Sequence, residues 1–153
     1  MQGLADRARE LGKILQQRRF SVVTAESCTG GGIARLLTDE PGASSWFERG
    51  FVTYSNLSKE EMLGVPRSLL ETHGAVSEEV VLAMARGALA HSNGDVSISV
   101  SGVAGPDGGT AEKPVGTVWI GWGLGEDVAE AQHFLFPGDR DGVRNRSMLA
   151  AIE

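Results

Sequence analysis

The chain has 153 residues, of which 41% are hydrophobic, a length and apolar content that fit one domain of ordinary size with a sizeable core. Its formal net charge of −6, without any lysine- or arginine-rich run, argues against a nucleic-acid-binding surface. The single cysteine excludes an internal disulfide and a multi-cysteine metal site, and His73, His91 and His133 lack metal-ligand spacing, so we expect no metal.

Targeting signals are not expected from this sequence. No apolar run approaches the length of a transmembrane helix. Residues 1–7 lack the apolar stretch of a signal peptide. We therefore expect a cytoplasmic protein that does not enter a membrane.

The first predicted elements are a helix, a strand and a second helix. Apolar residues recur at helical spacing from Leu4 to Leu15, among charged residues, which predicts an amphipathic helix. An apolar, β-branched run over residues 21–24 predicts a strand. Small polar residues and glycines interrupt the pattern over residues 27–32, and a helical pattern then begins at Ile33.

The turn over residues 27–32 places two hydroxyls and a thiol, those of Ser27, Cys28 and Thr29, between a strand and a helix. Such a turn leaves backbone N–H groups that can stabilise an anion. A nucleophile in this position is a recurrent catalytic design. The pattern also fits a phosphate-binding turn, or a polar turn whose glycines serve packing. The spacings of the Walker and Rossmann glycine motifs are absent.

The middle of the chain predicts a strand over residues 46–54 and a helix that ends at Gly64. This helix begins either at Ser58, which forms a capping-box pattern with Glu61, or at Ser55. A short helical segment over residues 67–71 and a longer helix starting at Ser77 follow.

The last part of the chain predicts three strands and a helix. A strand over residues 96–101 carries serines on one face, which indicates close packing or a polar neighbour. A long glycine-rich loop over residues 102–114 separates it from strands over residues 115–122 and 127–136. Asp139 caps a final helix that bears Arg140, Arg144 and Arg146.

This order predicts a single α/β domain over residues 1–153, with three α/β/α layers around a mixed, mostly parallel, five-stranded sheet. In such sheets, ligands bind beyond the carboxyl ends of the strands. Ser27, Tyr54 and the loop over residues 102–109 each follow a different predicted strand. We therefore expect them to meet at one edge of the sheet.

A serine nucleophile needs a base, and no histidine obviously faces Ser27. Tyr54 ends a predicted strand and Lys59 lies in the first turn of the next helix, so both can point to the same edge. Partial burial and the helix N-terminus favour a neutral lysine. A neutral lysine, or a phenolate held by a lysinium, can accept the serine proton. The alternative is that Tyr54 points to water and Lys59 lies on a solvated helix face.

Cys28 is a rival nucleophile, because thiols at helix N-termini have lowered pKa values. A lone cysteine is more often a small buried apolar residue, and we favour that interpretation. The loop over residues 102–109 can wrap a phosphate or a heteroaromatic ring with its amides, or it can be a purely structural cluster of turns. The arginines of the last helix can pair with a phosphate, although arginines at such positions commonly face solvent.

Several long motifs, in the same order, resemble the CinA C-terminal domain family. They are Ala25-Glu26-Ser27-Cys28-Thr29-Gly30-Gly31, Tyr54-Ser55-Asn56 with Lys59, His73-Gly74-Ala75-Val76-Ser77, the run from Ser101 to Gly109, and Lys113-Pro114-Val115-Gly116-Thr117. The resemblance spans nearly the whole chain. It implies a three-layer α/β/α fold with a five-stranded mixed sheet, usually assembled as a homo-oligomer.

The resemblance also implies an activity in pyridine nucleotide salvage: hydrolysis of nicotinamide mononucleotide to nicotinate mononucleotide and ammonia, without a metal or redox cofactor. It implies Ser27 as the nucleophile, assisted by Tyr54 and Lys59. The substrate is a small pyridine mononucleotide, and neither a nucleic acid nor a membrane is an expected partner. The expected substrate-binding residues are Cys28, Thr29, Gly30, Gly31, Asn56, Gly102, Ala104, Gly105, Arg140 and Arg146.

Two other interpretations remain open on the sequence. The chain can be a non-catalytic nucleotide-binding or assembly domain, in which the turn over residues 27–32 only holds a phosphate. It can also be an enzyme that uses Cys28 as its nucleophile. The resemblance covers only the C-terminal domain of full-length CinA proteins, so the separate nucleotide activity of their N-terminal domain is not expected.

Overall fold

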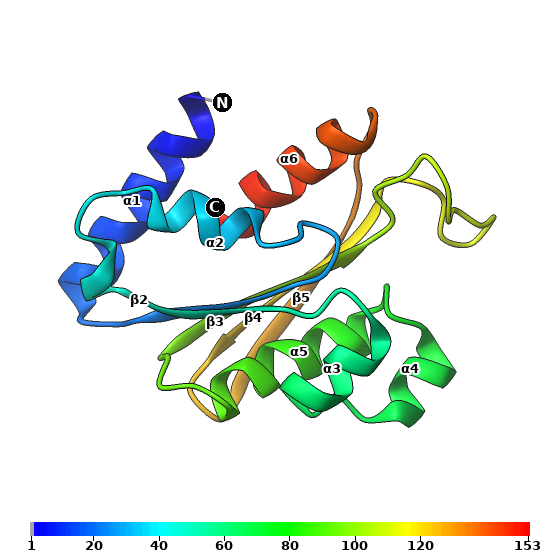
Figure 1. Cartoon of the computed structure of the whole chain (residues 1–153), viewed down its shortest axis with the longest axis horizontal. Coiled ribbons are helices and arrows are strands. Elements are labelled where there is room, and N and C mark those ends of the chain that lie inside the picture. The colour runs from blue at the N-terminus through cyan, green and yellow to red at the C-terminus, as the bar shows by residue number, and fades with distance from the viewer. Residues whose placement is uncertain (1) are drawn as a thin grey trace.

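A five-stranded sheet lies between two layers of helices in the computed structural model, which describes residues 2–153 (Figure 1). This arrangement confirms the predicted fold class. The elements are α1 (Gln2–Arg18), β1 (Val22–Glu26), α2 (Gly32–Thr38), a 3₁₀ turn η1 (Ala43–Ser45), β2 (Phe47–Val52), α3 (Asn56–Leu63), α4 (Arg67–His73), α5 (Glu78–Ala90), β3 (Val96–Gly102), β4 (Thr117–Leu124), β5 (Val128–Leu135) and α6 (Arg140–Ile152).

The sheet has the strand order β2-β1-β3-β4-β5. β1 pairs in parallel with both β2 and β3, whereas β4 is antiparallel to β3 and β5 is antiparallel to β4. β2, β1, β3 and β5 therefore run in the same direction, and the carboxyl ends of the first three lie side by side. The mixed character that the sequence predicts is confirmed, although only two of the four strand pairs are parallel.

The helices cover both faces of the sheet. α1, α2 and α6 lie on one face, and α3, α4 and α5 lie on the other (Figure 1). Neighbouring residues of β1 accordingly point into different cores: Val22 belongs to the core under α1, α2 and α6, and Val23 to the core under α5. Both side chains are fully buried, and burial of each stabilises the fold by about 1.5–3 kcal/mol.

α5 packs unusually close to the sheet because the residues beneath it are small. The hydroxyls of Ser97 and Ser99 on β3 donate hydrogen bonds of 2.9 and 2.7 Å to backbone carbonyls of α5. On the neighbouring strand, a Cβ at Gly121 or Gly123 would lie 2.5 or 2.6 Å from one of these hydroxyl oxygens. The predicted serine face thus serves close packing at these two positions.

Two boundaries differ from the sequence-based prediction around β2 and α3. The strand was expected to reach residue 54, but it ends at Val52. The backbone N–H of Thr53 still donates to the Glu26 carbonyl of β1 at 2.9 Å, but the carbonyls of Thr53 and Tyr54 accept hydrogen bonds from Lys59 instead of continuing the strand. Ser55, and not Ser58, caps α3, since its side chain accepts a hydrogen bond from the backbone of residue 58.

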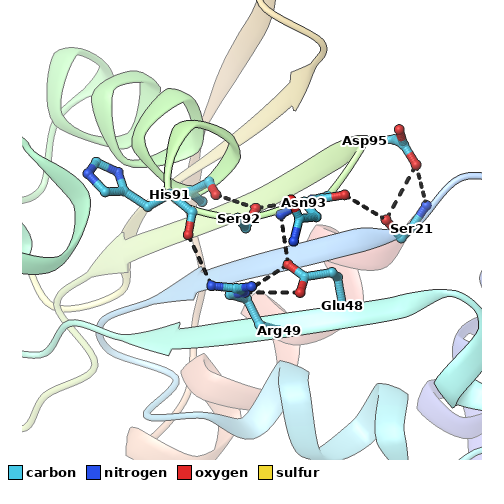
Figure 2. A network of polar contacts seen from close by, with 9 residues as sticks. Ser21, Glu48, Arg49, His91, Ser92, Asn93 and Asp95 are labelled. Atoms are coloured by element: carbon cyan, nitrogen blue, oxygen red, sulfur yellow. Dashed lines mark hydrogen bonds and ion pairs between the residues drawn. The ribbon is translucent and has the colours of Figure 1, made fainter.

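A polar network ties the amino ends of the strands together, far from the carboxyl ends of β1 and β3 (Figure 2). The Arg49 side chain donates to Glu48 at 2.8 Å and to the carbonyl of His91 at 3.2 Å. Glu48 also accepts from the backbone of Asn93 at 3.0 Å. The hydrogen bond from Arg49 lowers the pKa of the Glu48 carboxyl. The turn between α5 and β3 is therefore fastened to β2.

Candidate active site

A cavity of about 280 Å³ opens at the carboxyl ends of β1, β2 and β3, at the low end of the volumes of small-molecule sites. The loops that follow these strands meet there, as the order of the elements predicts. The cavity is lined by Ser27, Cys28, Tyr54, Asn56, Lys59, Ala75, Val76, Ser101, Gly102, Val103, Ala104, Gly105, Asp107, Gly108 and Arg140.

Lys59 joins the Ser27 hydroxyl inside this cavity. The Lys59 side chain extends from α3 and is only 1% exposed. Its Nζ donates to Ser27 Oγ at 3.0 Å, to the Thr53 carbonyl at 2.7 Å and to the Tyr54 carbonyl at 3.3 Å. The capped start of α3 and the two carbonyls that leave β2 together hold the amine against the hydroxyl.

The acceptors around Lys59 are uncharged oxygens, so its ammonium form is buried without a carboxylate to balance it. Burial lowers the pKa of Lys59 from 10.5 to about 8. At pH 7 about one tenth of the molecules then carry a neutral amine at this position, which can accept a proton from Ser27 Oγ.

Tyr54 takes part in this arrangement through its backbone and not through its phenol. Its side chain is 61% exposed. Its hydroxyl accepts a hydrogen bond of 3.2 Å from Arg140, whereas its carbonyl meets both Lys59 and the Ser27 hydroxyl. The expected contact of the phenol with the serine and the lysine is therefore not present, because the backbone turn after β2 directs the carbonyl inward and the side chain outward.

Cys28 lies beside Ser27 but has the properties of a buried, unreactive thiol. It is 5% exposed, and burial raises the pKa of its thiol to about 11. A thiol with this pKa stays protonated at neutral pH and is a poor nucleophile. The backbone N–H of Cys28 donates to no other residue within residues 2–153, and Cys28 lines the cavity.

Glu26 explains why the rest of the turn faces away from the cavity. Its fully buried carboxylate accepts from Thr29 Oγ1 at 2.6 Å, from the backbone N–H of Ile33 at 2.8 Å and from that of Ala34 at 3.0 Å. Gly30 and Gly31 adopt positive φ values of 59° and 95° and lead directly into α2.

Thr29, Gly30 and Gly31 were expected to bind substrate, but they do not line the cavity. The reason is that the hydroxyl of Thr29 is taken by Glu26 and the two glycines form the bend into α2. These three residues stabilise the conformation of the turn on the side that faces away from the cavity. Only Ser27 and Cys28 of this segment reach the cavity.

The arginines of α6 separate into three different roles. Arg140 lines the cavity and donates to the Gly105 carbonyl at 2.7 Å. Arg144 donates to the Thr29 carbonyl at 3.0 Å and so braces the turn from outside. Arg146 was expected to bind substrate, but it turns back to the Pro137 carbonyl at 2.9 Å and does not line the cavity.

The other expected binding residues, Asn56, Gly102, Ala104 and Gly105, do line the cavity. The backbone N–H groups of Ala104 and Gly105 donate to no acceptor in the part of the chain that the structure describes. With the guanidinium of Arg140 nearby, they form a group of donors suited to an anion.

Three lining residues, Ala75, Val76 and Ser101, were not expected at the site, and three others, Val103, Asp107 and Gly108, belong to the loop over residues 102–109 that was expected there without being named individually. Ser101 carries a weak signal, since it continues the alternating serines of the preceding strand. Ala75 and Val76 carry no chemical signal, and only the packing of the loop after α4 brings them to the site.

A larger apolar groove of about 480 Å³ lies at the other end of the sheet, beside the amino ends of β1 and β3. It lacks the pairing of a hydroxyl with a buried amine that marks the smaller cavity. In residues 2–153, no cluster of histidine, cysteine, aspartate and glutamate side chains is suited to hold a metal ion. The helices within that range are also too short or too polar to cross a membrane.

Known proteins resemble this chain over most of its length. Nicotinamide-nucleotide amidohydrolase PncC of Pseudomonas putida is 53% identical over 146 residues, which cover 95% of this chain and 91% of that protein. PncC of Escherichia coli K12 is 50% identical over 144 residues, covering 94% and 87%. A CinA-like protein of Akkermansia muciniphila is 55% identical over 138 residues, but the match covers only 33% of that longer protein.

Solved structures share the fold as well. The crystal structure of the competence/damage inducible protein CihA from Agrobacterium tumefaciens matches with a TM-score of 0.96 and 39% identity, covering 98% of this chain and 92% of that one. The sequence pattern of the CinA C-terminal domain matches residues 4–153. With the fold, the motifs and the relatives in agreement, this chain belongs to the CinA C-terminal domain family.

Proposed function

We propose that this protein is a nicotinamide-nucleotide amidohydrolase, which converts nicotinamide mononucleotide and water into nicotinate mononucleotide and ammonia. The observation that carries the proposal is the contact of 3.0 Å between the Ser27 hydroxyl and a buried lysine whose pKa is lowered to about 8. This pair lies in a cavity with anion-binding donors. Relatives that carry the name of this activity are 50% and 53% identical to this chain over more than 90% of its length.

In the first half of the proposed reaction, the neutral amine of Lys59 accepts the proton of the Ser27 hydroxyl while Oγ attacks the carboxamide carbon. The electron pair of the carbonyl moves to its oxygen, where the N–H of Cys28 donates to the developing charge. The lysine ammonium then gives its proton to the amide nitrogen. Ammonia leaves, and an ester joins the nicotinoyl group to Ser27.

In the second half, water takes the place of ammonia. The amine of Lys59, neutral again, accepts a proton from this water as the water oxygen attacks the ester carbon. Collapse of the intermediate breaks the bond to Ser27 Oγ, and the lysine ammonium returns the proton to that oxygen. Nicotinate mononucleotide is released, and both residues regain their starting protonation states.

The phosphate of the nucleotide is assigned to the glycine-rich side of the cavity. The N–H groups of Ala104 and Gly105 and the guanidinium of Arg140 supply the donors. Tyr54 supports both parts of the site, because its phenol accepts from Arg140 and its carbonyl accepts from Lys59. Asn56, at the first turn of α3, offers a further polar contact for the substrate.

A non-catalytic nucleotide-binding or assembly domain is the alternative, and it has no specific structural observation in its favour. Ammonia release from nicotinamide mononucleotide, measured for the wild type and for Ser27→Ala, separates the two functions. The amidohydrolase should release ammonia, and the variant should lose at least about a thousandfold in kcat at an unchanged unfolding midpoint. A wild-type protein that binds the nucleotide without releasing ammonia is a binding domain.

We also propose that the chain acts as a single domain in the cytoplasm, as a homo-oligomer and without a nucleic-acid partner. The net charge of −6 supports the last point. A phosphorylated substrate, which does not cross membranes unaided, supports the cytoplasm. The edge strand β5 exposes Val128 by 50% and Leu135 by 60%, which suits pairing with a second copy. Light scattering of the purified protein measures the number of subunits.

A further inference from the structure

Ser101 is the last of three serines that alternate along the α5-facing side of β3. The first two have structural partners in α5. Ser97 Oγ donates to the Ala85 carbonyl at 2.9 Å, and Ser99 Oγ donates to the Val81 carbonyl at 2.7 Å. A step of two residues along the strand therefore matches one turn of the helix.

Ser101 is the next residue on this face of β3, but it does not continue the series of hydrogen bonds to α5. One more helical turn leads from Val81 to Ser77, the N-cap of α5, whose carbonyl accepts a hydrogen bond of 3.1 Å from the backbone of Val81 but none from Ser101. The Ser101 hydroxyl makes no hydrogen bond with any residue in the range 2–153, although only 1% of the residue is exposed. The residue lines the cavity that contains Ser27.

The sheet register places Ser101 next to Ser27. β1 and β3 are parallel, with Ala25 opposite Ser99 and Glu26 opposite Val100. The backbone N–H of Ser27 continues this ladder with a hydrogen bond of 3.0 Å to the Val100 carbonyl. The next position opposite Ser27 is Ser101, and neighbouring strands lie about 4.8 Å apart.

The two sides of Ser27 therefore carry different groups. Lys59 approaches from the β2 side, where its amine is held by the carbonyls of Thr53 and Tyr54. Ser101 flanks Ser27 on the β3 side with a hydroxyl that is not used by the fold. A carboxamide over Ser27 must place its oxygen on donors, and its NH₂ group needs an acceptor. The N–H of Cys28 can only donate, whereas a hydroxyl can accept.

We propose that Ser101 is a substrate-binding catalytic residue, whose hydroxyl accepts a hydrogen bond from the nitrogen of the primary carboxamide while Ser27 attacks the carbon. This assignment rests on the proposed amidohydrolase function and specifies which end of the amide faces β3. When ammonia has left, the same oxygen accepts a hydrogen bond from the water that attacks the ester. Ser101 then orients both the leaving nitrogen and the incoming water.

The test compares Ser101→Ala with Ser99→Ala, a matched loss of one hydroxyl from the same face of the same strand. Ser101→Ala removes no hydrogen bond of the fold, so its urea unfolding midpoint should equal that of the wild type. Its kcat/KM for nicotinamide mononucleotide should fall by about 10- to 100-fold, mainly in kcat. Ser99→Ala should show the reverse: a lower midpoint, and a kcat/KM within about threefold of the wild type.

Ser101→Cys gives a second measurement, because a thiol keeps the shape of the side chain but is a weaker hydrogen-bonding group. Its kcat/KM should lie between those of the wild type and Ser101→Ala. A Ser101→Ala enzyme with wild-type kcat/KM would overturn the inference while the amidohydrolase function stands. A wild type that releases no ammonia overturns the proposed function itself, and the role of Ser101 with it.

Discussion

The lowered pKa of Lys59 predicts a specific dependence of the reaction on pH. With a pKa of about 8, the fraction of neutral amine rises from about one eleventh at pH 7 to about ten elevenths at pH 9. If the neutral amine is the base for Ser27, kcat/KM should rise about tenfold between these values and level off above pH 9. A lysine of ordinary pKa, 10.5, would give a hundredfold rise with no plateau in this range.

The assay separates nicotinamide and nicotinate mononucleotides by chromatography at each pH, so that the titration of ammonia does not disturb the readout. Lys59→Arg is the matched control, because a guanidinium stays charged and cannot act as the base at any of these pH values. It should be inactive throughout. A flat profile, a fall in rate above pH 7 or an active Lys59→Arg enzyme would each refute the role of the neutral amine.

Stability gives a second measurement of the same pKa without any turnover. Between pH 7 and 9 the unfolded lysine, with a pKa of 10.5, binds more protons than the folded one, so the free energy of unfolding rises with pH. The pKa values of about 8 and 10.5 correspond to a gain of about 1 kcal/mol over this interval. Urea titrations of the wild type and Lys59→Met should differ in their pH dependence by this amount. Parallel pH dependences would show that Lys59 is not held at a lowered pKa.

Three further predictions concern the neighbouring residues and the far end of the sheet. Cys28→Ala should keep kcat/KM within about threefold of the wild type, because the thiol, with a pKa of about 11, stays protonated at neutral pH. Loss of activity at an unchanged unfolding midpoint would support Cys28, and not Ser27, as the nucleophile. Arg140→Ala should raise KM by about 10- to 100-fold, as expected for the loss of a charged hydrogen bond to the phosphate. Arg146→Ala is the control, because Arg146 lies outside the cavity, and it should leave KM unchanged. Equal effects of the two substitutions would contradict the assignment of Arg140 to the phosphate. Glu48→Ala should lower the free energy of unfolding by about 1 kcal/mol without changing kcat/KM. The pKa of the Glu48 carboxyl is lowered in the folded state, so the stability that this carboxylate contributes is lost as the pH falls through its folded-state pKa. The destabilisation by Glu48→Ala should therefore become smaller at acidic pH. A destabilisation that does not depend on pH would exclude the carboxylate as its cause.

The edge of the sheet at which the site forms could be predicted from the sequence. Apolar, β-branched runs that stop at Ser27, near Tyr54 and at Gly102 mark the ends of strands. Parallel strands connected through helices must end on the same side. The prediction therefore needed only the order of the elements and the position where each strand ends.

The contributions of the arginines could be predicted only in part. Arg140 and Arg144 differ by four residues and lie about 40° apart around a helix, whereas Arg146 lies about 120° from Arg140. Helical spacing could therefore have separated Arg146 from the other two, although Arg146 was expected to bind substrate together with Arg140. The choice of Arg140 over Arg144 as the residue in the cavity required the position of α6 on the sheet, because Arg144 is used to brace the Thr29 carbonyl.

The orientation of Tyr54 could not be predicted, because it depends on a contact between separate elements. A residue at the end of a strand can turn either its side chain or its carbonyl inward. Here the Lys59 amine takes the carbonyl, and the phenol moves to Arg140. The same limit applies to Ser101, because only the packing of the start of α5 against β3 decides that its hydroxyl, unlike those of Ser97 and Ser99, has no carbonyl partner in the helix.

The sequence by itself determined the order of helices and strands, the α/β class and the set of segments that meet at one edge. Hydrophobic periodicity is a local property, and a helix between two strands allows them to pair in parallel. The tertiary structure decided which of these groups touch, and in what protonation state. The pKa of Lys59 depends on the side chains and carbonyls that exclude water from it, and these come from segments distant in the sequence. Burial of a charge is a property of the packed molecule, and no local pattern of residues records it.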